Sequence, residues 1–481
     1  MSDDNVLTAF RGVDNAFVQK NVAAGVGSIL EWYDFAVFGG LADVLAEALF
    51  PQAGASLLEA LAVFGAAFFM RPLGALVVGA VADSYTRKFA LELSIVMMAI
   101  PTVLIACIPP FSVWGYASTS LLLFLRLSQG FFVGGEIVTA FVFIFENTPK
   151  ARDAPVFAAL QFGFVNFGSA SGLAVALLLR TILSHDQLLS FGWRIAFALG
   201  GPIALVGIVL RRGLTDDSAV SKRQDGTPIT FESLLRPVRA AAAEHGLRML
   251  LFGLVAATAL TPFYISFIWL PLGFEELNID RGFSISLAGI ALLLILIAGF
   301  AGFTRAHEPT MIAKDSDDAF EKSRIRFDIS KNARYMYRVG MIVLLVMPPI
   351  MFALLDSFRN ELTAAATIVV LASGTALVTT ALPGILVTSF PPENVTVAAG
   401  FAYNVTAAVF GGLAPIYAML LIDISPILVG LLISGVSVIS TTALYLLEWT
   451  IDPEAYRGAP ADGSAKKIDA KAAAYGATSV A

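Results

Sequence analysis

The chain has 481 residues, of which 57% are hydrophobic and only 14% are charged, with a formal net charge of −6 and a mean hydropathy of +0.78. Soluble domains average about 45–50% apolar and about 25% charged residues, so this composition excludes an ordinary water-soluble fold. The single Cys107 excludes a disulfide framework, and the three histidines have no partner at helical spacing. We therefore expect a lipid bilayer as the environment, and no metal, cofactor or nucleic acid partner.

Twelve apolar stretches are long enough to cross a bilayer, which takes about 20 residues in a helix. Proline and polar residues separate them, as is typical of breaks between helices. The predicted spans are 21–48, 56–82, 89–109, 115–145, 155–180, 194–211, 248–272, 284–304, 338–356, 361–388, 394–421 and 425–448.

The distribution of basic residues predicts the orientation. Residues 1–20 carry charges and no apolar core, so they predict a cytoplasmic segment rather than a cleavable signal peptide. With an even number of spans, most Lys and Arg residues fall on the side of the two termini, which are therefore predicted to be cytoplasmic. At the ends of the spans and in the connections between them, the opposite side holds only Arg180, Arg194, Arg281 and Arg359.

The polar stretch 212–247 divides the spans six and six, and its composition predicts a solvated cytoplasmic linker. The predicted fold is an all-α integral membrane protein of 12 transmembrane helices in two pseudo-symmetric six-helix bundles, at 21–211 and 248–448. A second charged stretch, 305–338, is expected to be an inserted loop. The Ala-, Gly- and Ser-rich tail 449–481 is expected to be disordered and cytoplasmic.

Two carboxylates, Glu31 and Asp34, lie within the first predicted span. Their spacing places them on one helix face. Because a carboxylate in hydrocarbon costs about 2.5–3.5 kcal/mol on insertion scales, that face must line a polar or paired interior. The two groups suit a proton-coupling pair. The alternative is that one of them neutralises an arginine of a neighbouring helix.

Two arginines also lie within spans, Arg71 in the second and Arg126 in the fourth. A guanidinium can hold a substrate carboxylate through two parallel hydrogen bonds, or it can pair with a carboxylate of the protein. For Arg71 both roles stay open, with Glu31 and Asp34 as the candidate partners. Either role requires a carboxylate near the middle of the bundle.

The fourth span places Gln129 and Glu136 on one helix face, along a seam that contains Gly130 and Gly134. The G-x-x-x-G spacing favours close packing of two helices. Polar side chains in such a seam indicate a lined cavity. Glu136 is predicted to be either the moving proton site or a partner of Arg126.

The connection between the second and third spans carries Asp83, Arg87 and Lys88. An acidic residue just past a helix end, followed by two basic residues, predicts a cytoplasmic charge clasp that forms in one state of a carrier and breaks in the other. A solvated loop would have a similar composition.

These motifs resemble those of the major facilitator superfamily and, within it, the metabolite–proton symporters of organic acids and osmolytes. Residues 79–88 resemble the superfamily's loop signature, although Ser84 and Thr86 replace its usual basic residue and glycine, and residues 126–130 match its R-x-x-Q-G. The segments most similar to the symporter family are EWYDF at 31–35, RPLG at 71–74, QGFFVGGE at 129–136, GWRI at 192–195, and YN, FGG and P between 403 and 415.

The resemblance implies a secondary active transporter, monomeric in the plasma membrane, that carries a small carboxylate-bearing organic solute with H+ by alternating access. The expected site residues are, for proton coupling, Glu31, Asp34 and Glu136, and, for substrate binding, Arg71, Arg126, Gln129, Tyr403 and Asn404. An enzyme is not expected, because the spans hold no nucleophile–base pair or cluster of metal ligands. Two alternatives remain, a non-transporting sensor on a carrier fold and an uncoupled facilitator or exchanger for a zwitterionic osmolyte.

Overall fold

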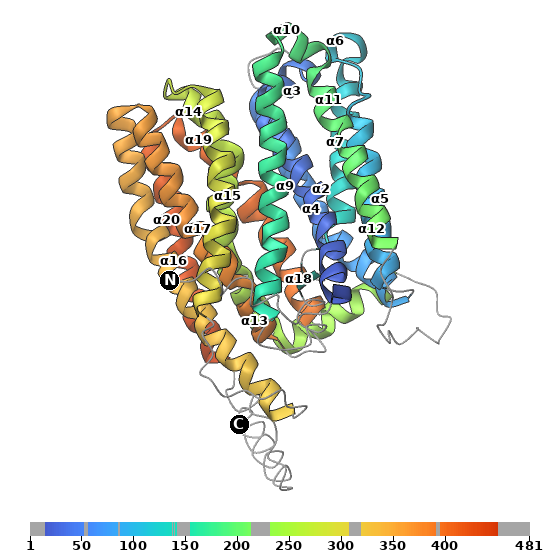
Figure 1. The fold of residues 1–481 in the computed structure, drawn as a ribbon, viewed down its shortest axis with the longest axis vertical. Coiled ribbons are helices and arrows are strands. Elements are labelled where there is room, and N and C mark those ends of the chain that lie inside the picture. Colours follow the sequence, from blue (N-terminus) through green and yellow to red (C-terminus); the bar gives the residue numbers. More distant parts are fainter. Residues whose placement is uncertain are drawn as a thin grey trace, which may run out of the picture.

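The structure, a computed structural model, describes residues 15–51, 56–84, 87–136, 138, 140–141, 154–212, 231–306, 319–390 and 395–450. Within these ranges every regular element is helical (Figure 1). In hydrocarbon a spanning backbone satisfies its own N–H and C=O groups only in a helix or a closed barrel, so the long apolar stretches fold as helices. The predicted all-α fold is confirmed.

The first half of the described chain forms six helical columns, several of them built from consecutive helices. They are α2 (Asn15–Gly40) with α3 (Ala42–Leu49), α4 (Ser56–Ser84), α5 (Arg87–Ile105), α7 (Tyr116–Val133), α9 (Ala154–Ile182), and α11 (Trp193–Ala198) with α12 (Gly200–Arg212). The short helices α6 (Phe111–Trp114) and α10 (His185–Gln187) and the π-helix η2 (Leu188–Gly192) lie in the connections at one end.

The second half forms six further columns among the described residues. They are α13 (Phe231–Tyr264) with the π-helix η3 (Ile265–Trp269) and α14 (Leu270–Glu276), α15 (Arg281–Ala306), α16 (Ala319–Phe358), α17 (Glu361–Ser389), α18 (Val395–Thr406) with the π-helix η4 (Ala407–Gly412) and α19 (Ala414–Ile422), and α20 (Pro426–Thr450). Each column overlaps one of the twelve predicted spans, although α13 and α16 begin well before theirs. Among the described residues, eight segments are long and apolar enough to cross a membrane, and two more are apolar over a shorter length.

The predicted linker is helical in its second part. Residues 231–247 begin α13, which bends at His245, where φ is −126° and ψ is 17°. The stretch therefore connects the halves through a helix that turns into the bundle, while residues 213–230 lie outside the described part.

The charged stretch 305–338 is not a loop along its whole length, so that expectation is wrong from Ala319 onward. Helix α16 contains 40 residues and carries this charged part continuously into the membrane span. One basic residue of this charged part has a partner on another helix. Arg338 donates from Nη2 to both carboxylate oxygens of Glu448 on α20, each at 2.6 Å.

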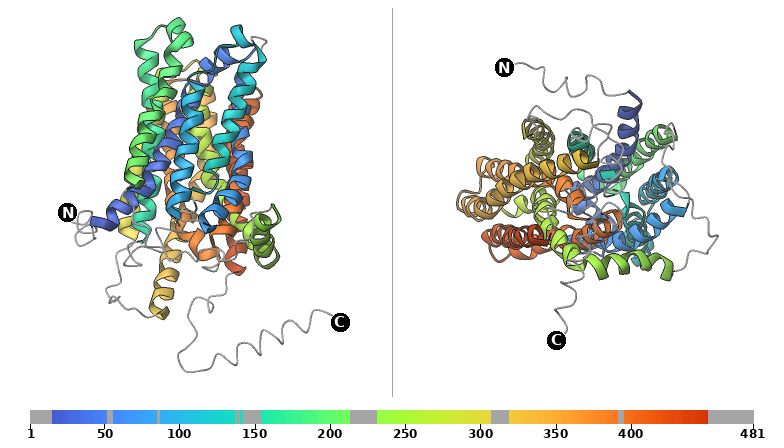
Figure 2. Two further views of the ribbon diagram at one scale, coloured as in Figure 1. Left: turned by 90° about the vertical axis from the view of Figure 1, so that its right-hand side faces the viewer. Right: turned by 90° about the horizontal axis from the view of Figure 1, so that it is seen from below.

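The two halves stand next to each other, with the blue-to-green half and the yellow-to-red half distinct in Figures 1 and 2. Between them, α4 packs against α18 and η4, α9 packs against α15, and α2 contacts η3. Candidate side chains of the first span therefore lie close to the boundary between the halves. This boundary is where a carrier of two such bundles holds its solute.

The predicted cytoplasmic gate lies at the edge of what is described. Asp83 belongs to the end of α4, and Arg87 and Lys88 begin α5. Their side chains lie outside the described part, as do residues 85 and 86 between the helices. Residues 1–14 and the predicted tail from residue 451 also lie outside it.

Helices α4 and α7 approach so closely that glycine is required at their contact. A Cβ atom on Gly130 would collide with the carbonyl group of Ala67, and one on Gly134 would collide with that of Arg71. The packing interpretation of this G-x-x-x-G seam is confirmed. Close contact here sets the distance between Arg71 on α4 and the polar residues of α7.

We expect Gly130→Ala to destabilise the protein by about 1–3 kcal/mol, because the backbones of α4 and α7 must separate to admit a methyl group. Gly289→Ala on α15 is the matched control, since a Cβ there has no neighbour within 4 Å. Thermal unfolding of the purified variants in detergent measures the difference. Equal melting temperatures for the two variants would contradict the close-contact argument.

Candidate functional site

Arg126 is held in the interior of the first half by several partners. Its Nη1 donates to the carboxylate of Asp34 and, at 2.9 Å, to Oε1 of Gln129. Nε2 of Gln129 donates to Oδ1 of Asp34 at 3.0 Å and to the hydroxyl of Thr102 at 2.7 Å. The guanidinium also lies 4.2 Å from the ring centroid of Phe38. This network ties α2, α5 and α7 together.

Arg71 has fewer partners. Its Nη2 donates to Oε1 of Glu31 at 2.9 Å, and both side chains are at most 2% exposed. The guanidinium carbon lies 4.2 Å from the ring centroid of Phe68 and 5.0 Å from that of Phe35. Nε of Arg71 and Oε2 of Glu31 are buried and make no hydrogen bond in the described structure. The pair therefore keeps unused hydrogen-bonding capacity on both of its members, whereas the carboxylate and the amide bound to Arg126 are each held by more than one hydrogen bond.

The ion-pair alternative raised by the sequence thus describes both carboxylates of the first span. Glu31 pairs with Arg71, and Asp34 pairs with Arg126. Glu136 is 3% exposed and close enough to act electrostatically on Glu31. The structure therefore brings the three predicted proton-coupling residues into one buried cluster, in which the partner of Arg126 is Asp34.

The second half contributes Tyr403 and Asn404 from α18. Nδ2 of Asn404 donates to the carbonyl of Gly134 at 2.5 Å and to that of Gly400 at 2.8 Å, so this amide joins the two halves. Tyr403 is buried and lies within electrostatic range of Arg71 and Glu31. The structure thus places Tyr403 within electrostatic range of the Arg71–Glu31 pair. It places Asn404 against the backbone of the glycine seam.

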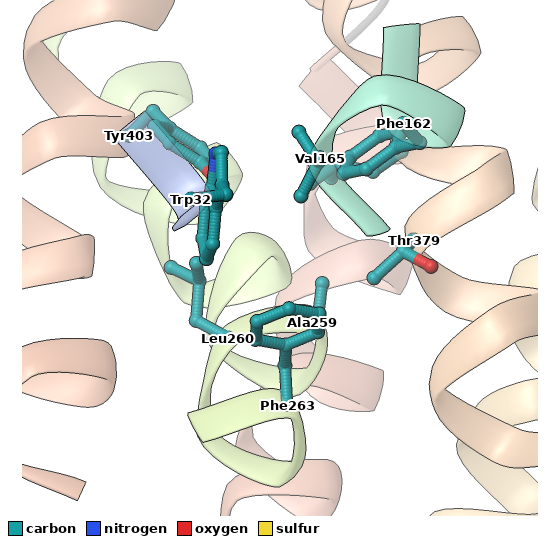
Figure 3. Close-up of a pocket in the computed structure, with 9 residues that line it drawn as sticks. Trp32, Phe162, Val165, Ala259, Leu260, Phe263, Thr379 and Tyr403 are labelled. Atoms are coloured by element: carbon teal, nitrogen blue, oxygen red, sulfur yellow. The ribbon is translucent and has the colours of Figure 1, made fainter. Parts of the chain in front are cut away.

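A small cavity with room for little more than a water molecule lies between the halves beside this cluster. Figure 3 shows Trp32 and Tyr403 on one side, Phe162 and Val165 on the other, and Phe263 at the lower edge. Sequence reasoning singled out Tyr403 but missed the other rings. The one signal available in the sequence was that Trp32 directly follows Glu31. Neighbouring side chains of a helix differ in direction by about 100°, so both can face a broad interface.

A second charged cluster joins the halves at the end opposite to Asn15 and Thr450, and sequence reasoning missed it. Asp43 of α3 accepts hydrogen bonds from Arg180 of α9 and Arg281 of α15, and Arg281 also pairs with Glu275. Asp43 and Arg281 are separated by more than two hundred residues, so no local pattern connects them. From the sequence, Arg180 and Arg281 are recognisable only as basic residues on the side opposite to the predicted cytoplasmic termini.

Comparison with known proteins relates part of the chain to transporters. The family model described as "Sugar (and other) transporter" matches residues 20–221. The chain is 33% identical over 275 residues to the proline/betaine transporter of Salmonella typhimurium, covering 54% of this chain and 53% of that protein. It is 34% identical over 221 residues to the alpha-ketoglutarate permease of Escherichia coli, covering 46% of this chain and 51% of that protein. The chain spans about half the length of these curated relatives.

The fold extends the similarity over almost the whole chain. The proton:xylose symporter XylE, a major facilitator superfamily protein, superimposes with a TM-score of 0.67, covering 91% of this chain and 96% of that structure at 14% identity. A partially occluded, inward-open structure of XylE from E. coli gives a TM-score of 0.64. The chain has the fold of these major facilitator superfamily structures. Its long apolar helices make it a multi-pass membrane protein.

Arg71 and Arg126 should respond differently to replacement by lysine, which keeps the charge but loses the planar fork. We expect Arg126→Lys to lower stability by about 1–3 kcal/mol, because one ammonium cannot reproduce the shared contacts with Asp34 and Gln129. Arg71→Lys should retain the melting temperature of the parent and weaken solute binding. Thermal unfolding and binding assays on both variants test this contrast, and an equal loss of stability in the two would contradict it.

Proposed function

We propose that the chain is a secondary active transporter that carries a small carboxylate-bearing organic solute together with protons by alternating access. The observation that carries the proposal is the buried Arg71–Glu31 pair at the boundary between the halves, with one oxygen of Glu31 and Nε of Arg71 unbonded in the described structure. Relatives named for proline/betaine and for alpha-ketoglutarate support a carboxylate-bearing solute, since all three compounds contain that group.

In this proposal, proton coupling arises because Glu31 and the carboxylate of the solute compete for the guanidinium of Arg71. While Glu31 is ionised, its carboxylate holds Arg71 at 2.9 Å. A proton on Glu31 removes the charge that binds Arg71, which is then able to hold the carboxylate of a solute. Asp34 and Glu136 lie within electrostatic range of Glu31, so the three carboxyl groups belong to one buried cluster. Solute and proton therefore bind cooperatively in this scheme.

Contacts at two levels of the bundle support alternating access. The cluster of Asp43, Arg180 and Arg281 closes the boundary between the halves at the outer end. Asn404 links the halves through the carbonyl of Gly134. Movement of one half against the other has to break the outer contact to open that side, in the way that packed bundles exchange between discrete arrangements. Gln129 and Arg126 would hold α2 and α7 together as one body during this movement.

The finer predictions from the sequence remain part of this proposal. The two bodies correspond to 21–211 and 248–448, both termini are cytoplasmic, and the protein works as a monomer in the plasma membrane. The motifs around Glu31, Arg71 and Glu136 and the named relatives support a place among the metabolite–proton symporters.

Solute counterflow in proteoliposomes tests the transport function itself. We expect the reconstituted protein to exchange labelled solute against an unlabelled internal pool of the same solute, using betaine, proline and alpha-ketoglutarate as the panel. An inward proton gradient should drive accumulation, and a protonophore should abolish it, because uphill movement depends on coupled proton entry. No counterflow with any member of the panel would favour the sensor alternative. Accumulation that survives the protonophore would remove proton coupling and leave an exchanger or a carrier coupled to another ion.

Replacing Glu31 separates coupling from binding. Glu31→Gln mimics a permanently protonated carboxyl, so we expect solute exchange to continue while proton-driven accumulation is lost. Glu136→Gln is the comparison: if Glu136 only tunes Glu31, this variant keeps accumulation and shifts its pH dependence to lower pH, since removal of a negative charge makes Glu31 easier to ionise. Exchange, accumulation and thermal unfolding are measured on both. Loss of accumulation in Glu136→Gln alone would move the proton site to Glu136.

A further inference from the structure

The charged cluster at the outer end contains two carboxylates and two guanidinium groups, and each half supplies one of each. Asp43 of α3 and Arg180 of α9 belong to the first half. Glu275 of α14 and Arg281 of α15 belong to the second half, and Figure 1 shows α3 and α14 at the same end of the molecule. Asp43 accepts hydrogen bonds from both arginines, and its bond to Arg281 crosses the boundary. The cluster can therefore be divided between the halves with one complete ion pair left in each.

The ion pair of the first half is held by that half itself. Besides Asp43, Arg180 binds the carbonyl of Gly40 at the end of α2, from Nε at 3.1 Å and from Nη2 at 3.0 Å. Helices α2 and α9 are in close contact, because a Cβ atom on Gly172 would collide with the carbonyl of Tyr33. The bonds of Arg180 to Gly40 and Asp43 therefore do not depend on the second half.

The ion pair of the second half is local in the sequence. Glu275 lies near the end of α14, and Arg281 is the first residue of α15. The turn between them places Asn278 in the left-handed region, at a φ of 62°, and the N–H of Asn278 donates to the carbonyl of Glu275 at 2.9 Å. Oδ1 of Asp280 accepts from the N–H of Phe283 at 2.6 Å, which caps the start of α15. Both members of this pair therefore move together with the second half.

We propose that these four residues form a latch that exchanges partners when the outer side opens. Asp43 leaves Arg281 and stays with Arg180, and Glu275 becomes the sole partner of Arg281. Because a partly buried charge is destabilised when it loses its partner, this exchange lets the halves separate with every charge of the cluster still paired. Arg281 is 18% exposed and Glu275 is 56% exposed, so Glu275 binds Arg281 from the side that faces water. The inference rests on the proposed alternating access and makes Glu275 the competitor of Asp43.

The latch predicts that removing one carboxylate or the other shifts the halves in opposite directions. In Asp43→Asn the bond across the boundary is lost, and Arg180 and Arg281 repel each other when the halves meet, so the outer side should open more often. In Glu275→Gln, Asp43 no longer shares Arg281 with a competitor, so the closed outer side should be favoured. We expect the ratio of open to closed molecules to change about 1.5- to 5-fold in each case, as for one partly exposed ion pair.

Distances between spin labels on the purified full-length protein, measured by pulsed EPR, give this ratio. The labels are attached through Asp186→Cys in α10 and Asp423→Cys at the end of α19, two exposed positions on different halves, after Cys107→Ser has removed the native thiol. Glu276→Gln is the matched control for Glu275→Gln. Glu276 is the next residue of α14, is exposed and is not a member of the cluster.

Three results would overturn the latch. They are shifts of Asp43→Asn and Glu275→Gln in the same direction, an unchanged ratio in Glu275→Gln, and an equal shift in the control. A carboxylate that only stabilised the fold would lower the melting temperature without moving the two variants apart in opposite directions. Since Glu275 is an exposed side chain, its variant tests the proposal by itself if Asp43→Asn does not purify as a folded protein.

Counterflow on the same preparations distinguishes this inference from the proposed function. Counterflow by the parent without the opposite shifts leaves the carrier function standing and removes the latch. Opposite shifts in a protein that shows no counterflow with any solute of the panel keep the latch and remove the carrier function.

Discussion

Burial of charge in a low-dielectric interior is the constraint on which the rest of this structure depends. Arg126 and Asp34 are fully buried, and removal of one partner from such a pair costs about 3–5 kcal/mol because the other charge remains without compensation. Gln129 hydrogen-bonds to both members of this pair and to Thr102. Three helices of the first half are thereby linked through one buried network.

The difference between the two ion pairs gives them different uses. Arg126 shares its contacts among a carboxylate, an amide and a ring, so changing its partner would disrupt several helices at once. Among the described residues, Arg71 forms an ion pair with Glu31 alone. Helix α4, which carries Arg71, packs against α18 and η4 of the other half. A competing carboxylate needs to replace only that one bond. A buried ion pair therefore holds helices together at Arg126, whereas the ion pair at Arg71 suits an exchange of partners.

The two halves contribute different kinds of side chain to the boundary, although each consists of six helical columns. Among the described residues, every fully buried Asp, Glu or Arg side chain belongs to the first half. The second half brings rings, amides and π-helical segments to the boundary, and Thr261 donates to the carbonyl of Phe410 within η4 at 2.7 Å. Such a bonded irregular backbone is tolerated at membrane depth because it is buried in protein. Among the described residues, buried charge thus resides in the first half, whereas the shape of the cavity depends on both halves.

The sequence by itself determined the class of fold, the twelve spans and the identity of the charged residues, because hydrophobic length and the cost of intramembrane charge act locally along the chain. It also identified the close seam at Gly130 and Gly134. Only the tertiary structure decided that Glu31 pairs with Arg71 and Asp34 with Arg126, since helix spacing puts both carboxylates on one face and does not select their partners. The contacts of Asp43 with Arg281 and the ring cavity around Trp32 likewise join residues far apart in the chain, and only packing of one half against the other brings them together.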